Sequence, residues 1–192
     1  MNIIKKLSPN FSDRGGYKPE VIVVHISAGT LDSMTSWFSS VDSQVSAHYG
    51  VGKDGRIMQY VEEINKAWHA GNISNPTFKL FKGININPNN YTIGIENEGM
   101  DLSQAPALQL DTLCNLIKDI ASRWNIPLDR DHIIGHYQIN GTVKANCPSP
   151  DHTVIDRLIM PRLVIPIVDE QVCLKVPKSR LDIINKFLSS LK

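Results

Sequence analysis

Two histidines, one cysteine and one glutamate are the residues of this chain whose types and spacing could do chemistry together. His25 lies in the β-branched run VIVVHIS, and His136 and Cys147 flank a segment that contains Gly141. Imidazole and thiolate are zinc ligands, and three protein ligands leave the fourth tetrahedral position open for water, as in a catalytic zinc site. Glu96 supplies a carboxylate that could accept a proton from that water. Together these residues predict a metal-dependent hydrolase.

Each of these ligand candidates also has an ordinary structural interpretation. A histidine in an apolar strand is more often a hydrogen-bonded core residue than a ligand, and Cys147 could be a free thiol in a loop. His132 and His136 have the spacing of a helical ligand pair, but on the strand favoured by Ile133 and Ile134 they stand about 13 Å apart. Only one of the two can then bind this metal. His136 is preferred because it ends the strand, where the loop to Cys147 begins.

The choice of metal and the charge near it follow from the same residues. A blue-copper site would need a weak axial methionine near Cys147, and the next methionine, Met160, is remote. Zn²⁺ is therefore the predicted cofactor. Lys144 is either a point charge that stabilises an oxyanion or an ordinary solvated loop lysine.

The pattern of apolar residues predicts a mixed central β-sheet flanked by helices, in a single layered α/β domain. Strands are expected at 21–27 and 91–99, a hairpin at 48–61 with its turn at Asp54-Gly55, and a further strand at 132–136. Helices are expected from Thr30, over 103–125, and after Asp151 until near Pro161. The segment 62–90 is rich in Asn, is interrupted by Gly71, Pro76, Gly83 and Pro88, and is predicted to be irregular.

The chain is expected to divide into one main domain, residues 1–162, and a C-terminal extension or linker, residues 163–192. A final amphipathic helix is predicted in the extension, with Leu181, Ile184, Leu188 and Leu191 on one face. About 30 residues are too few for an independent hydrophobic core.

The overall composition limits the possible partners. The formal net charge is +1, so no long-range field draws the protein to nucleic acid or to an anionic membrane. Three widely separated cysteines do not indicate a disulfide framework. No apolar run has the length of a signal peptide or of a membrane span, which predicts synthesis in the cytoplasm and no membrane insertion. The sequence does not specify an oligomeric state.

Six segments resemble one family when taken in order. They are VIVVHISAG, SAHYGVGKDGRIMQYV, AWHAG, YTIGIENEG, HIIGH and KANCPSP, and they span about residues 20–150. They resemble the zinc-dependent N-acetylmuramoyl-L-alanine amidases of the type-2 class, which are related in fold to peptidoglycan recognition proteins. The resemblance implies a catalytic domain that cleaves bacterial peptidoglycan between N-acetylmuramic acid and L-alanine. It also implies zinc ligands at His25, His136 and Cys147, with Glu96 as acid/base.

The same resemblance suggests residues that bind the substrate. Trp68 and His69 of AWHAG resemble part of a substrate groove, although Trp68 could be a core aromatic and His69 a capping residue. His48 of the hairpin is a further substrate-binding candidate. It follows Ala47, where some members have a tyrosine, so the acid/base role falls on Glu96.

The loop before Cys147 departs from the family pattern. The family often has Lys-x-Cys, whereas Lys144-Ala145-Asn146-Cys147 places the lysine one residue further away. This spacing puts the oxyanion role of Lys144 in question, and Asn146 is a second candidate for it.

Three other functions compete with the amidase. A peptidoglycan-binding module of the same fold would not cut, although such modules commonly lose a zinc ligand. A cysteine hydrolase would use Cys147 and His136 and has no role for His25. A glycosidase would pair Glu96 with Glu98. For the amidase, the expected settings are a phage endolysin first and a bacterial autolysin second, acting on the wall after release from the host cell.

Overall fold

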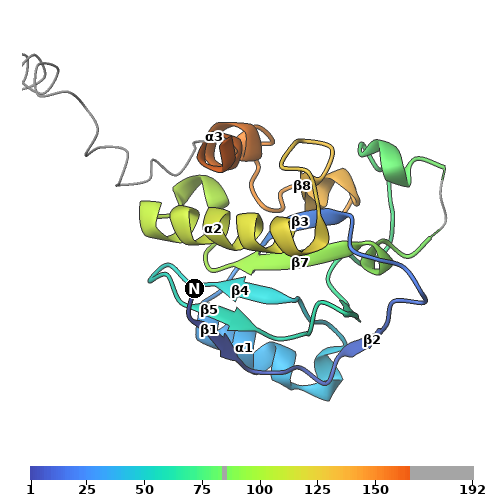
Figure 1. Ribbon diagram of the computed structural model, residues 1–192, viewed down its shortest axis with the longest axis horizontal. Coiled ribbons are helices and arrows are strands. Elements are labelled where there is room, and N and C mark those ends of the chain that lie inside the picture. The colour runs from blue at the N-terminus through green and yellow to red at the C-terminus, as the bar shows by residue number, and fades with distance from the viewer. Residues whose placement is uncertain (84–85, 165–192) are drawn as a thin grey trace, which may run out of the picture.

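The described residues form a six-stranded mixed β-sheet with helices on both faces, which confirms the predicted fold class (Figure 1). The computed structural model describes residues 1–83 and 86–164. The strand order is β1-β5-β4-β7-β3-β8. These strands are β1 Ile3–Lys5, β3 Val21–Ile26, β4 Tyr49–Val51, β5 Ile57–Gln59, β7 Thr92–Asn97 and β8 Ile133–Gly135. A separate antiparallel pair joins β2 Phe11–Asp13 to β6 Asn65–Ala67.

Three parallel strands form the part of the sheet that matters for the site. The central strand β3 pairs in parallel with β7 on one side and with β8 on the other. On the other side of β7 lies β4, also parallel, and β4 and β5 form the predicted antiparallel hairpin. Its turn contains Gly55 with φ +81°, a conformation that a glycine adopts without steric cost. The carboxyl ends of β3, β7 and β8 therefore lie side by side.

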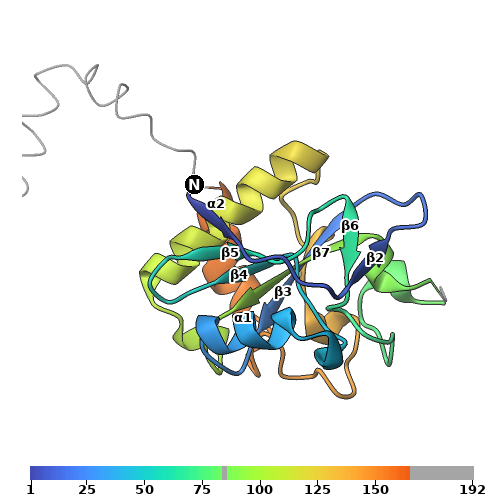
Figure 2. The same ribbon diagram turned by 90° about the horizontal axis from the view of Figure 1, so that it is seen from below.

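The helices cover the two faces of the sheet, as Figure 2 shows from a second direction. The α-helices are α1 Leu31–Ser39, α2 Ala107–Trp124 and α3 Met160–Val164. Short 3-10 turns are η1 Val41–Ser43, η2 Lys79–Phe81, η3 Pro88–Asn90, η4 Leu102–Gln104 and η5 His136–Gln138, and η6 Ile155–Ile159 is a π-helical turn. Thr30 caps α1 as predicted, because its side chain accepts a hydrogen bond from the backbone N–H of Ser33 at 3.1 Å.

Two helix boundaries differ from the prediction. The long helix begins at Ala107 rather than near Ser103, because Pro106 disfavours a helical conformation at Ala105. The last described helix does not end at Pro161 but continues to Val164. In a regular α-helix the ring of Pro161 would clash with the carbonyl of Arg157. Arg157 lies in the preceding π-helical turn, whose wider geometry relieves this clash.

The alternation of side chains along β3 sends its residues into two different apolar layers. Ile22 and Val24 belong to the core under α2, whereas Val21 and Val23 pack on the opposite face. His25 continues the second set, so its side chain lies on the face opposite α2. The predicted strand thus positions His25 as the period of two requires.

Parts of the sequence-based prediction lie outside the described residues. The amphipathic helix predicted around Leu181 to Leu191 is one of them, and the proposed domain boundary after residue 162 stays a prediction. Within 1–83 and 86–164, the helices are all too short or too polar to cross a lipid bilayer.

Candidate metal centre and active site

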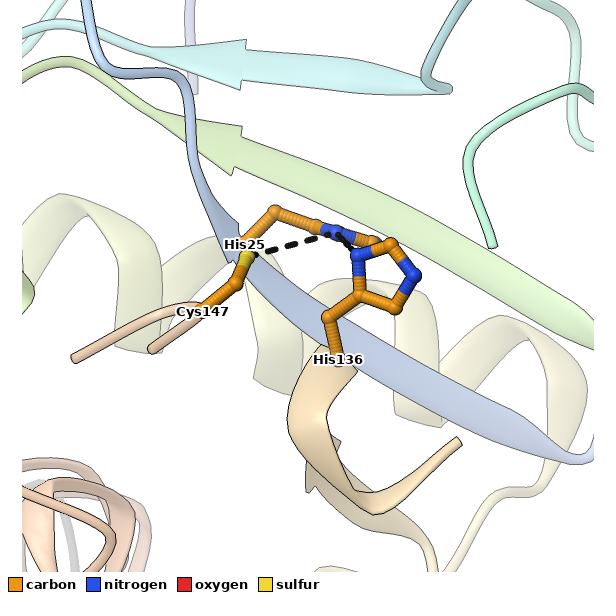
Figure 3. Close-up of side chains that lie close together, drawn as sticks. All are labelled: His25, His136 and Cys147. Atoms are coloured by element: carbon orange, nitrogen blue, oxygen red, sulfur yellow. Dashed lines mark hydrogen bonds between the residues drawn. The ribbon is translucent and has the colours of Figure 1, made fainter. Parts of the chain in front are cut away.

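The carboxyl ends of the three parallel strands bring together residues that are far apart in the sequence. His25 is the register partner of Glu96 across the β3–β7 pair. Val24 is the partner of Gly135, so His136, which follows β8 directly, lies beside His25. Cys147 returns to the same place from the following loop (Figure 3). The fold therefore gathers the predicted ligands and the predicted acid/base residue at one edge of the sheet.

Backbone hydrogen bonds hold the loop that carries Cys147. The N–H of Tyr137 donates to the carbonyl of Cys147 at 2.9 Å, which ties the end of the loop to its beginning. The N–H of Cys147 donates to the carbonyl of Lys144 at 3.0 Å, which closes a turn over Ala145 and Asn146. The long connection after His136 is thus folded back, and the thiol comes within reach of the imidazoles.

The three donor atoms of His25, His136 and Cys147 all lie within 4.8 Å of one another. Nδ1 of His25 is 3.0 Å from Nδ1 of His136 and 3.9 Å from Sγ of Cys147 (Figure 3). In a tetrahedral zinc site, standard bond lengths give ligand separations of about 3.3 Å for two nitrogens and about 3.6 Å for nitrogen and sulfur. The spacing and the donor set therefore fit a zinc ion after small side-chain shifts.

The outer nitrogen of His136 also fits a metal ligand. Nε2 lies 2.9 Å from the carbonyl of Ala70, so this nitrogen carries the hydrogen and Nδ1 keeps a lone pair that faces the centre. Burial lowers the pKa of His136 to about 4, so the ring is neutral near pH 7, as ligation requires.

Glu96 is a largely buried carboxylate beside this centre. Its side chain is 16% exposed, and Oε1 lies 3.9 Å from Nδ1 of His25. Within the described part of the chain, Oε2 has no hydrogen-bond partner. Burial raises the pKa of Glu96 to about 7, and the nearby positive charge of Lys144 acts in the opposite direction. A carboxyl group with this pKa can accept and return a proton near neutral pH.

A cavity of about 730 Å³ opens over these residues. Nearly all of the site candidates from the sequence line it: His25, Trp68, His69, Glu96, His136, Lys144, Asn146 and Cys147. Trp68 is half-buried, and its indole N–H donates to Oγ of Ser12 at 3.0 Å. Lys144 and Asn146 both come from the turn before Cys147, so the altered Lys-x-Cys spacing still leaves both side chains at the cavity.

His48 does not reach the cavity, which corrects the expectation that it contacts a substrate. Its side chain is fully buried. Nδ1 accepts a hydrogen bond from the N–H of Gly94 at 3.0 Å, and Nε2 lies 2.8 Å from Nη2 of Arg14. The alternation along the hairpin strand turns this side chain into the interior, where it supports β7.

Three exposed apolar residues that the sequence did not indicate as site residues also line the cavity. Trp37 lies on α1 at helical spacing from the buried Met34, but it is 58% exposed and lines the cavity. Successive residues of an α-helix are about 100° apart around its axis, so Trp37 lies about 60° from Met34 and about 100° from Phe38. It is therefore at the edge of the buried face of α1. Met100 and Val143 are each 74% exposed and also line the cavity. Together with Trp37 they form an apolar rim. The position of Trp37 at the edge of the apolar face of the helix is the sequence feature that could have indicated an exposed aromatic residue.

His69 lines the cavity, but most of its side chain is buried. It is 8% exposed, and its Nδ1 lies 3.0 Å from Nε2 of His25. Its backbone N–H donates to Oδ1 of Asn89 at 3.2 Å. The sequence does not predict this contact with His25, because nothing in the AWHAG segment indicates which residue its histidine faces.

Comparison with curated proteins shows relatives that are amidases by name. N-acetylmuramoyl-L-alanine amidase A of Achromobacter lyticus is 34% identical over 119 residues, which cover 60% of this chain and 58% of that protein. The AmpD 1,6-anhydro-N-acetylmuramyl-L-alanine amidase of Salmonella typhimurium is 30% identical over 162 residues, covering 74% of this chain and 81% of AmpD. The match to the Achromobacter protein thus spans less than two thirds of its length.

Solved structures share the fold. A selenomethionine derivative of AmpD superposes with a TM-score of 0.66 at 24% identity and covers 82% of this chain and 94% of that one. A mutant endolysin from Bacillus subtilis gives a TM-score of 0.60 at 23% identity and covers 85% and 99%. The family model described as N-acetylmuramoyl-L-alanine amidase matches residues 15–150, which include His25, Glu96, His136 and Cys147. The chain therefore belongs to the N-acetylmuramoyl-L-alanine amidase family.

Proposed function

We propose that the protein is a zinc-dependent hydrolase of bacterial peptidoglycan, which cleaves the amide between the lactyl group of N-acetylmuramic acid and L-alanine of the stem peptide. One observation carries the zinc-dependent mechanism. Two neutral imidazoles and a thiol converge beside the carboxyl group of Glu96, whose Oε2 is buried without a hydrogen-bond partner among the described residues. Membership of the amidase family supports the choice of bond.

His25, His136 and Cys147 would hold the ion, and all three lie within the proposed catalytic domain, residues 1–162. Bound zinc supplies a Lewis acid that polarises the scissile carbonyl and lowers the pKa of a water. The protein orients the ligands through the outer contacts of the two rings and through the turn that ends at Cys147. The rigidity of three adjacent strands keeps them in place.

Glu96 is the proposed general acid/base. Its carboxylate accepts a proton from the attacking water, and the resulting carboxyl group then donates a proton to the leaving nitrogen of L-alanine. A pKa raised by burial suits both steps, because neither protonation state is strongly disfavoured near neutral pH. The positive charge of Lys144 acts against this shift, which supports a place for this lysine near the reacting groups.

Lys144 and Asn146 are the proposed donors to the developing oxyanion. Both line the cavity from the turn next to Cys147. A lysine acts there as a point charge, and an asparagine amide as an oriented neutral donor. Trp68 and the exposed Trp37 offer apolar surfaces that suit the sugar and peptide portions of the substrate.

The structure weighs against the competing hydrolases. Glu98 accepts a hydrogen bond from the N–H of Lys53 at 2.9 Å and is not among the cavity residues, so it does not pair with Glu96 as in a glycosidase. A cysteine hydrolase has no role for His25, although Nδ1 of His25 lies 3.9 Å from Sγ of Cys147. A binding module has no evident use for Glu96 beside a complete ligand set.

Mass spectrometry of cell-wall digests tests the proposal. With zinc, we expect stem peptides that begin with a free L-alanine amine, together with intact glycan strands. The same digest with a chelator should release neither product. New reducing sugar ends, or release that persists with the chelator, would overturn the proposed reaction. Stoichiometric zinc without any released peptide would instead indicate a binding module.

A further inference from the structure

We propose that His69 is a positioning residue that fixes the ring of His25 and thereby the nitrogen which His25 offers to the metal. This inference rests on the proposed zinc site. The two rings meet edge to face, with centroids 5.1 Å apart and an interplanar angle of 86°. Nδ1 of His69 lies 3.0 Å from Nε2 of His25. The Nε2 side of the His25 ring therefore faces His69, and its Nδ1 side faces the candidate metal centre.

A chain of hydrogen bonds defines which nitrogens carry hydrogen when a metal is bound. The hydroxyl of Thr92 donates to the carbonyl of Pro88 at 2.9 Å. Its oxygen can then accept from Nε2–H of His69 at 3.0 Å. This leaves Nδ1 of His69 as an acceptor for Nε2–H of His25. Nδ1 of His25 consequently keeps its lone pair, which points toward His136 and Cys147.

The backbone of β7 makes room for the ring of His69. A Cβ atom at Gly94 would lie 2.4 Å from Cγ of His69, too close for any side chain there. On the other side, Oδ1 of Asn89 accepts from the N–H groups of His69 and Ala70, at 3.2 Å and 2.8 Å. The segment that carries His69 is thus held against the sheet, and the imidazole is clamped in one orientation.

This arrangement does more than fill space, because both ring nitrogens of His69 face a matched partner. A leucine of similar size would fill the volume but offer no acceptor to His25. The His25 ring could then turn or carry its hydrogen on Nδ1, and either change removes a ligand. Loss of such an outer partner typically costs 10- to 100-fold in metal affinity.

Zinc affinity, measured by competition with a chelator, tests the role of His69. We expect His69→Leu to lower the affinity roughly 10- to 100-fold. His69→Asn should recover most of it, because the Asn Oδ1 occupies nearly the position of the His Nδ1. His132→Asn, at a partly exposed histidine paired with Asp129, is the matched control and should bind zinc like the wild type.

Further measurements separate positioning from folding. If His69→Leu does not fold, Thr92→Val should weaken zinc binding and Thr92→Ser should not, because only serine keeps the hydroxyl. In the zinc-loaded wild type, nitrogen-15 NMR should place hydrogen on Nε2 of both His25 and His69.

Three results would overturn the inference: wild-type affinity in a folded His69→Leu protein, no recovery in His69→Asn, or hydrogen on Nδ1 of His69 in the loaded protein. If the wild type itself binds no zinc, the proposed function fails first.

Discussion

Glu96 and His25 are register partners in neighbouring parallel strands, and Oε1 of Glu96 lies 3.9 Å from Nδ1 of His25. A slip of one residue along β7 would turn Glu96 to the opposite face of the sheet. Ile93 and Ile95, which pack in the core under α2, resist that slip because it would expose them to the cavity side. The apolar pattern that builds the core therefore also places the acid/base candidate beside a metal-ligand candidate.

Replacing Glu96 by glutamine should separate chemistry from metal binding. We expect Glu96→Gln to lower kcat by roughly 10²- to 10⁴-fold, because the amide cannot take up the proton of the attacking water. Zinc content should stay at the wild-type level, since none of the proposed ligands is changed. Steady-state kinetics on a soluble muropeptide and metal analysis of the purified protein check both expectations.

Glu98→Gln is the matched control for this variant. Glu98 lies two residues after Glu96, just beyond the end of β7. Its carboxylate accepts a hydrogen bond from the N–H of Lys53 and does not line the cavity. Its kcat should remain within about twofold of the wild type, as expected for a surface substitution away from the site. A Glu96→Gln enzyme as active as Glu98→Gln would remove Glu96 from the mechanism.

The same glutamate should lower the stability of the metal-free protein at high pH. Burial raises the pKa of Glu96 to about 7 from 4.5, so between these values the unfolded chain releases its proton first. The folded state then binds more protons, and the contribution of Glu96 to the free energy of unfolding falls as pH rises through this window. A shift of this size corresponds to about 3 kcal/mol at pH 8.

Urea denaturation with a chelator present measures this effect. Relative to the wild type, Glu96→Gln should gain about 2–3 kcal/mol of unfolding free energy between pH 5 and pH 8, because glutamine does not ionise. A constant difference between the two proteins over that range would show that Glu96 ionises in the folded protein as it does in the unfolded chain.

The sequence predicts the parts of this molecule that depend on local pattern. The alternation of β-branched residues around His25, and of Ile93 and Ile95 around Glu96, gives both strands and the face of each side chain. His136 ends a strand and is followed by a loop, which predicts that the loop can bring Cys147 close to it. These features need only the period of a strand and the meeting of parallel strand ends.

The remaining features depend on tertiary contacts that a local pattern does not contain. The pair of three-residue strands β2 and β6 joins segments that are far apart, and neither is long enough to show a period. The contact between His69 and His25 depends on how the segment before β7 folds back. The burial of His48 depends on Arg14, which belongs to a distant part of the chain.

Replacing Cys147 should weaken zinc binding more than replacing a residue, such as His69, that contacts a ligand but not the metal. In Cys147→Ser the thiolate is lost, and a neutral hydroxyl is a poor zinc ligand. We expect the zinc affinity to fall by more than about 100-fold, the upper end for an outer partner such as His69. Cys114→Ala is the control, because Cys114 is a buried residue of α2 and its Sγ faces the carbonyl of Ile159 in η6. Equal zinc affinities in the two variants would contradict the proposed ligand set.

Trp37 should contribute to substrate binding without contributing to the fold. It is 58% exposed on α1 and lines the cavity, so Trp37→Ala removes apolar surface from the site and little from the core. We expect a loss of about 1 kcal/mol of binding free energy, or about fivefold in KM, with kcat nearly unchanged. Phe11→Ala is the comparison, because Phe11 is 46% exposed on β2 and does not line the cavity. If both variants have the wild-type KM for a soluble muropeptide, the apolar rim does not bind substrate, and recognition must lie with the polar residues around Lys144 and Asn146.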